Sequence, residues 1–241
     1  MDKRILESYD NWSLDRAVFS KQPKPRHVER MENPIENGLI HTKAENAPVQ
    51  VPPSNSSSQT RQELVQMARD IEAVGKKKQQ KIVSKYDSGF EWKFEKICKD
   101  LGIKWNKEYV DRLIEESGDI ILQLKYKWNR PRPFQLAPML GIKMNVGKAY
   151  TAGTPSFPSG HSAQSQLIAD VLSKVYPLHR DAFQTVPEKV SYSRYIGGLH
   201  FPSDIEYGKQ IGHWLASHTN TDSYWTECRN YNTTDNGQRI H

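Results

Sequence analysis

From about residue 59 onwards, apolar residues recur at the spacing of a helix, whereas the first 60 residues show no such period. Leu64, Met67, Ala68 and Ile71 follow the i, i+3, i+4, i+7 pattern of an amphipathic helix. A longer apolar stripe predicts a helix from about residue 106 to residue 128, with Pro131 as its expected stop. The members of that stripe are Val110, Leu113, Ile114, Ile121, Leu124 and Trp128.

Further helices are expected over about 80–100, 160–176, 178–197 and 202–217, with a short one over 138–142. Gly89 weakens the continuity of the first of these, and Ser159 and Pro177 fit the cap and the stop of the second. No segment shows the alternation of a strand. The pattern therefore predicts an all-α helical bundle from about residue 60 to residue 220.

The chain divides into three parts by composition. Residues 1–60 form an irregular N-terminal arm, because six prolines there exclude long helices, and Asn55–Ser58 closes it as a linker. The arm is either disordered or wraps its own domain or a partner subunit, as in a homo-oligomer or a larger assembly. Residues 61–219 are the helical domain, and residues 220–241 are an irregular tail.

Composition narrows the class of protein. Apolar residues make up 36% of the chain and the mean hydropathy is −0.77, so part of the chain lies outside a core. There is no transmembrane segment and no secretory signal at the start. Cys98 and Cys228 are expected to be free thiols. These features predict a cytoplasmic protein, in the host cytoplasm or a virion if a virus encodes it.

The net charge of +6 is modest, but Lys76–Lys78 and Lys81 form a local basic run. Without interleaved aromatic residues this run indicates a solvated helix face, and no nucleic-acid partner is expected. A role at a lipid surface stays open.

Ser159-Gly160-His161 stands where a long helix is expected to begin. Backbone N–H groups at a helix start, with the positive end of the dipole behind them, can bind an anion, and His161 would lie beside it. An ordinary cap next to an unrelated histidine explains the same residues.

His200 and Asp204 are four residues apart, with Arg194 just before them. A carboxylate bonded to one imidazole nitrogen leaves the other nitrogen free, which suits a nucleophile or a base. A core histidine paired with a capping aspartate is the alternative.

Lys125, Arg130 and Arg132 add cations near the end of the longest predicted helix. Arginine contacts phosphate in a planar, bidentate way, and lysine supplies a movable point charge. A metal site among the two histidines and the aspartate is not expected, because nearby cations would repel the ion.

Together these clusters resemble the signature of the type 2 phosphatidic acid phosphatase and vanadium-dependent haloperoxidase superfamily. The resemblance covers about residues 106–217 and matches at every signature position, in order. The matching residues are Lys125-x6-Arg132-Pro133, Pro158-Ser159-Gly160-His161 and Ser193-Arg194-x5-His200-x3-Asp204.

The resemblance implies a role for each of these residues. His200 attacks phosphorus and forms a phosphohistidine, Asp204 orients His200, and His161 protonates the leaving group and then activates water. The non-bridging phosphate oxygens are held by Lys125, Arg132, Arg194, Ser159 and Gly160.

Two details favour the soluble phosphatase branch. His200-Phe-Pro-Ser-Asp204 is similar to the phosphatase form of the motif, and no additional histidine stands just before Pro158. The resemblance implies metal-independent hydrolysis of a small, water-soluble phosphomonoester without a cofactor. The alternatives are a haloperoxidase, which would hold vanadate at the same site, and a non-catalytic anion-binding or structural protein.

Overall fold

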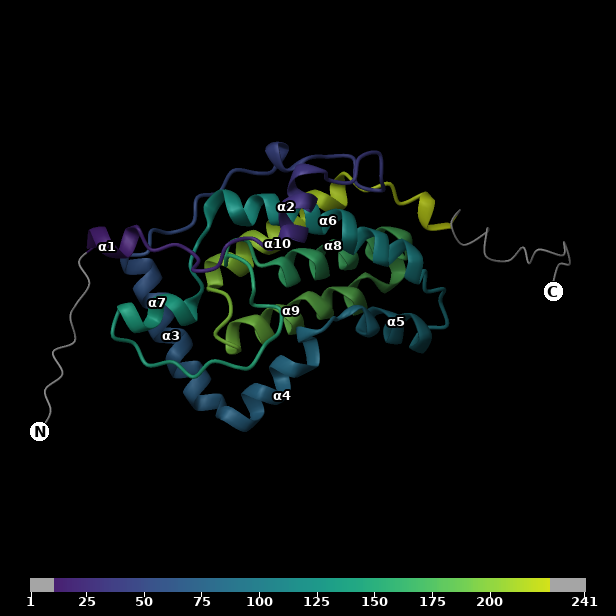
Figure 1. Cartoon of the computed structure of the whole chain (residues 1–241). Coiled ribbons are helices and arrows are strands. Elements are labelled where there is room, and N and C mark those ends of the chain that lie inside the picture. Colours follow the sequence, from purple (N-terminus) through teal and green to yellow (C-terminus); the bar gives the residue numbers. More distant parts are fainter. Residues whose placement is uncertain (1–10, 226–241) are drawn as a thin grey trace, which may run out of the picture.

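The computed structural model describes residues 11–225, and within this range it is all-α, as the sequence predicted (Figure 1). The only β-type pairing in the described part of the chain is a single antiparallel bridge between Ile40 and Thr219. None of the helices in this part is both long enough and apolar enough to cross a membrane.

The bundle is built around α8 (Gly160–Val175), which packs against α10 (Pro202–Ser217), α9 (Arg180–Ile196) and α6 (Lys107–Trp128) (Figure 1). The closest approach is between α8 and α10, where Gly208 and Gly212 lie one turn apart. A Cβ atom on Gly208 would lie 2.6 Å from the backbone oxygen of Ser159, and one on Gly212 would lie 2.5 Å from that of Ala163. These two glycines therefore let the middle of α10 pack closely against the start of α8.

The predicted helix over 80–100 is two helices, α4 (Lys76–Asp87) and α5 (Glu91–Asp100). The chain breaks at Gly89, and the carboxylate of Glu91 accepts a hydrogen bond from the N–H of Phe90 (2.7 Å), which starts the second helix. The helix before them, α3 (Ser58–Val74), lies close to its predicted position.

Two predicted details at the end of α6 are wrong. The helix is ended by Asn129, which adopts a left-handed conformation (φ 46°), and not by Pro131. The short helix that follows is α7 (Pro133–Met139) and begins five residues before the predicted one, because Pro133 occupies its first turn.

The described part of the N-terminal arm packs on the chain's own helices. It contains α1 (Asn11–Asp15), α2 (Pro25–Glu32) and the 3₁₀ helix η1 (Ala44–Asn46). Phe19, Leu39 and Ile40 are buried, and the N–H groups of Leu39 and Ile40 donate to the carboxylate of Glu116 (2.7 and 3.0 Å). The described part of the arm therefore wraps its own domain, which is one of the alternatives that the sequence left open.

The expected linker at Asn55–Ser58 is an ordered junction. Asn55 is buried and donates to the carbonyls of Leu14 and Ala17 (both 2.8 Å), so it ties the arm to the start of α3. The side chain of Ser57 caps that helix by accepting from the N–H of Thr60 (3.1 Å).

The remaining described segments follow α8 and α10. The 3₁₀ helix η2 (Pro177–His179) leads into α9, and the first residues of the tail place Tyr224 in the main core, where it donates to the backbone oxygen of Lys104. Cys98 is a buried free thiol, and burial raises its pKa to about 11. Cys228 and the rest of the tail, residues 226–241, lie outside the described range.

Candidate active site

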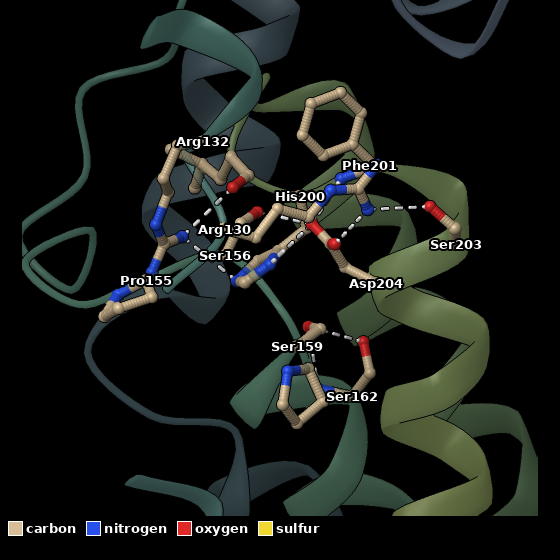
Figure 2. A network of polar contacts seen from close by, with 12 residues as sticks. Arg130, Arg132, Pro155, Ser156, Ser159, Ser162, His200, Phe201, Ser203 and Asp204 are labelled. Carbon is tan, nitrogen blue, oxygen red and sulfur yellow. Dashed lines mark hydrogen bonds and ion pairs between the residues drawn. The ribbon is translucent and has the colours of Figure 1, made fainter. Parts of the chain in front are cut away.

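The three sequence clusters meet where α8 and α10 begin and where the chain leaves α6 (Figure 2). The N–H of Ser159 donates to the backbone oxygen of Asp204 (2.9 Å), which joins the two helix starts directly. The N–H of Ser156 donates to the backbone oxygen of Arg130 (2.9 Å), which joins the loop before α8 to the segment after α6. These backbone hydrogen bonds therefore fix the relative positions of the segments that carry the site residues.

The start of α8 carries the predicted anion-binding group. Ser159 is the N-cap, and its hydroxyl accepts from the N–H of Ser162 (3.4 Å). Gly160 is the first helical residue, and the space beside it is bounded by Lys125, whose Cε lies 3.7 Å from the position of a Cβ. The helix start and the lysine thus face one site, and the charges of both favour an anion there.

Lys125 and Arg132 are buried cations without a carboxylate partner. The Nζ of Lys125 donates to the carbonyls of Pro155 and Pro158 (2.7 and 2.6 Å), and Arg132 donates to the carbonyls of Thr154 and Leu199 (2.8 and 3.0 Å). Within residues 11–225 neither forms an ion pair.

Burial shifts the pKa of both cations downward. The pKa of Lys125 lies well below its ordinary value because of burial and then because of Arg132, while Asp204 opposes the shift. Burial also lowers the pKa of Arg132 to about 10, with a further contribution from Arg194. The site therefore holds concentrated positive charge that a bound anion would relieve.

Arg194 completes the group of cations and is held by Asp87, the last residue of α4. Its Nη1 lies 3.1 Å from the Oδ1 of Asp87 and 3.4 Å from the Nε2 of His161. Asp87 also accepts from the N–H of Tyr150 (2.6 Å) and the hydroxyl of Thr151 (2.5 Å). The Nη2 of Arg194 is buried and has no hydrogen-bond partner in the described part of the chain.

His200 lies between Asp204 and Arg132. Its Nδ1 is 3.5 Å from the Oδ2 of Asp204, and its Nε2 is 3.0 Å from the Nη1 of Arg132. Because a guanidinium only donates, Nε2 must present its lone pair to Arg132 and the ring proton lies on Nδ1, toward the carboxylate. This tautomer leaves the lone pair of Nε2 on the side of the ring that faces Arg132.

The pKa values of both site histidines are lowered in the ligand-free site. The pKa of His200 lies well below its ordinary value because of burial and then because of Arg132, against the opposing effect of Asp204. Burial and then Arg194 lower the pKa of His161 to about 3. His161 is nonetheless partly exposed, and its ring packs 5.9 Å from that of Phe90.

Asp204 is fully buried and stays ionised through its partners (Figure 2). Arg130 donates to Oδ1 (2.6 Å), while the N–H of Phe201 (2.8 Å) and the hydroxyl of Ser156 donate to Oδ2. Burial pushes the pKa of this carboxyl upward, but Arg130 and then His200 and Ser156 hold it well below its ordinary value.

The structure brings together all eight residues that the sequence assigned to the site, and it adds others. Arg130 was noted as a cation, but its pairing with Asp204 could not be predicted. Glu63 on α3 accepts from the N–H and hydroxyl of Ser203 (3.0 and 2.9 Å) at the start of α10. Neither Asp87 nor Glu63 has a spacing signal, because each comes from a helix far away in sequence. The residues added around the site are Glu63, Asp87, Arg130, Thr151, Ser156 and Ser203.

Comparison with known proteins agrees with the sequence resemblance. Residues 117–226 match the family model described as the PAP2 superfamily. The chain is similar to a lipid A 1-phosphatase of Rhizobium etli, with 27% identity over 124 residues, which are 48% of this chain and 50% of that protein. It is also similar to a non-specific acid phosphatase of Salmonella typhi, with 39% identity over 57 residues, which are 24% of this chain and 23% of that protein. The chain thus spans about half the length of the lipid A 1-phosphatase.

A solved structure shows the same fold. The crystal structure of a bacterial vanadium-dependent iodoperoxidase superposes with a TM-score of 0.60 at 17% identity, covering 85% of this chain and 60% of the other. The fold prediction of a helical bundle of the phosphatase and haloperoxidase type is therefore confirmed.

Proposed function

Since residues 117–226 match the family model of the PAP2 superfamily, we propose that this chain hydrolyses phosphomonoesters through a phosphohistidine on His200, without a metal ion. In this proposal, each of the eight site residues has the role that the family resemblance implied. What supports it is the charge and geometry of this site.

The observation that carries the proposal is the pair of buried cations, Lys125 and Arg132, that lack a carboxylate partner within residues 11–225. A buried charge without a counterion is costly. A phosphomonoester is a dianion at neutral pH and supplies two negative charges at once. Arg194, already paired with Asp87, still has one unpartnered Nη2 atom for a third oxygen.

The first step forms a bond between the Nε2 of His200 and phosphorus. The bond from phosphorus to the ester oxygen breaks, and the leaving alkoxide takes its proton from His161. Arg132 must move its Nη1 from Nε2 to a phosphate oxygen, so substrate binding itself exposes the nucleophile. Asp204 stays in place, held by Arg130, and its carboxylate stabilises the positive ring that results.

The second step reverses these roles. His161, now neutral, takes a proton from water, the oxygen attacks phosphorus, and the bond to Nε2 breaks. His161 has a pKa of about 3 in the ligand-free site, because of burial and Arg194. A dianion bound beside it raises that pKa and so allows His161 to carry the proton that the first step needs.

The proposed substrate class is a phosphomonoester, and the names of the relatives indicate two kinds of substrate. One relative is named for lipid A and the other as non-specific. We propose a small, water-soluble phosphomonoester such as a nucleotide or a sugar phosphate, and make a lipid phosphate the other arm of the test.

The test is phosphate release from nucleotide, sugar and lipid phosphates in EDTA, with and without vanadate. We expect release in EDTA, inhibition by vanadate and loss of turnover in His200→Ala. His213→Ala is the matched control, because His213 is exposed on the same helix α10 and its one partner within residues 11–225 is Asp170. Vanadate fits the same cations, so activation of halide oxidation by vanadate, without phosphate release, would replace the proposal with the haloperoxidase activity.

A further inference from the structure

The outer face of α4 is a row of unpaired lysines. Lys77, Lys81 and Lys85 are spaced by four residues and are exposed, so they lie along one side of the helix. The only acidic residue of α4 is Asp87, which is buried and bonded to Arg194. No residue in the described range forms an ion pair with any of the three lysines. This positive charge is therefore not neutralised within residues 11–225.

Aromatic side chains mark the end of this row that lies next to the active site. Trp92 stacks on Tyr86 (centroids 6.2 Å apart), and the Nζ atoms of Lys85 and Lys93 lie 5.7 and 4.6 Å from the centroid of its ring. Trp92 is 39% exposed. Tyr150 is 100% exposed, although its backbone N–H is fixed by Asp87.

The lysines crowd one another at this end. Partial desolvation lowers the pKa of Lys93, and Lys85 and Lys189 lower it further. Cations that disfavour each other's charge are relieved by an external anion. The geometry and the pKa therefore agree that this surface is built to meet negative charge.

We propose that this basic strip, defined as Lys77, Lys81, Lys85 and Lys93 with Trp92 and Tyr150, docks the protein on an anionic lipid bilayer. In Figure 1, α4 lies at the lower edge of the molecule, away from α2 and the arm, so neither covers it. The strip ends at Asp87, which holds Arg194, so docking brings the active site to the bilayer surface.

The side-chain types favour a bilayer over a nucleic acid. Lysine combined with exposed tryptophan and tyrosine is typical of side chains that lie in the headgroup region, where an aromatic ring has both apolar and polar neighbours. Nucleic-acid surfaces favour arginine for bidentate phosphate contact and aromatic rings interleaved along the cationic track. The basic strip has no arginine, and its aromatic residues lie at one end only.

The experiment is co-sedimentation of the full chain with vesicles of phosphatidylcholine, with and without phosphatidylserine. We expect binding only to the anionic vesicles and weakening by added salt. The triple change Lys77→Gln, Lys81→Gln, Lys85→Gln should weaken binding roughly 100-fold, since each lysine near an anionic surface contributes about fivefold. Tyr150→Ala should weaken it severalfold.

The matched control makes the same charge change elsewhere. Lys24→Gln, Lys104→Gln, Lys127→Gln removes three exposed lysines outside α4 and should leave vesicle binding nearly unchanged. Equal loss in both triple variants, equal binding to neutral vesicles, or binding to an RNA oligomer alone would overturn the inference. Turnover of a soluble phosphomonoester is measured alongside and should be equal in both variants, so failure of docking and failure of the proposed function are separable.

Discussion

Asp204 lies closer to Arg130 than to His200: its Oδ1 is 2.6 Å from the Nη1 of Arg130, whereas its Oδ2 is 3.5 Å from the Nδ1 of His200. The carboxylate is thus neutralised mainly by Arg130, which also donates to the hydroxyl of Ser203. In the proposed mechanism Asp204 orients His200, although at this distance the Nδ1 of His200 has no hydrogen-bond partner in the described part of the chain.

This relationship predicts that Arg130 contributes to the stability of the fold as well as to catalysis. Arg130→Ala leaves a fully buried carboxylate unpaired and should lower the free energy of unfolding by about 3–5 kcal/mol. Arg130→Lys should cost less. Denaturant unfolding measures both, and an Arg130→Ala protein as stable as the parent would show that Asp204 is stabilised without its arginine.

Stability should fall in mild acid because of the two site histidines. The folded pKa of each lies below the unfolded value of about 6.5, so the unfolded chain binds protons first as the pH falls. The contribution of the two histidines to the free energy of unfolding is therefore fully present above about pH 6.5. It decreases toward pH 3, by up to about 1.4 kcal/mol per pH unit for each histidine. Unfolding curves between pH 4 and 8 measure this slope.

His161→Gln provides the control for that slope, because it removes one titrating group and should reduce the dependence by about half. Inorganic phosphate should also reduce it, since a bound anion favours the protonated imidazole. A slope that His161→Gln leaves unchanged would assign the acid sensitivity to other groups.

Asp87 should act as a positioning residue for Arg194. Asp87→Asn keeps the shape but removes the charge that fixes the guanidinium, and we expect kcat/KM to fall roughly 10- to 100-fold. Asp100→Asn is the matched control, because Asp100 pairs with Lys96 on the exposed face of α5. If the effect is on stability alone, with kcat/KM unchanged, Asp87 does not position the catalytic cation.

The N-terminal arm should be released by a change at Glu116. Its carboxylate accepts from two buried N–H groups of the arm, and Gly38 leaves room for it, since a Cβ there would lie 2.3 Å from the carboxylate. Glu116→Ala should cost about 1–3 kcal/mol and speed proteolytic cleavage of residues 33–50. Equal cleavage rates in the parent and the variant would mean that other contacts hold the arm.

Much of the fold could be predicted because apolar stripes such as Val110, Leu113 and Leu124 repeat at helical spacing. The proximity of the eight residues assigned to the site could be predicted because they belong to three motifs that follow one another between residues 125 and 204. The ends of the helices were harder to predict than the helices themselves. Asn129 ends α6 in a left-handed conformation, and Pro133 starts α7. Both effects depend on backbone conformation, about which the spacing of apolar residues gives no information.

Tertiary partners could not be predicted at all. Asp87 meets Arg194 over a separation of 107 residues, and Glu63 meets Ser203 over 140. A single sequence carries no signal for such pairs, because each residue alone is an ordinary polar residue of a helix. The arm is similar, since Leu39 and Ile40 are too few to show a period although both are buried.

The proposed mechanism depends on the phosphorylation of His200, and this intermediate can be trapped. The protein is mixed with a phosphomonoester, quenched in alkali, digested and mapped by mass spectrometry under conditions that preserve phosphoramidates. We expect acid-labile phosphate on His200, absent in His200→Ala and accumulating in His161→Ala when the substrate has a good leaving group. Phosphate on another residue, or undiminished turnover in His200→Ala, would contradict the account.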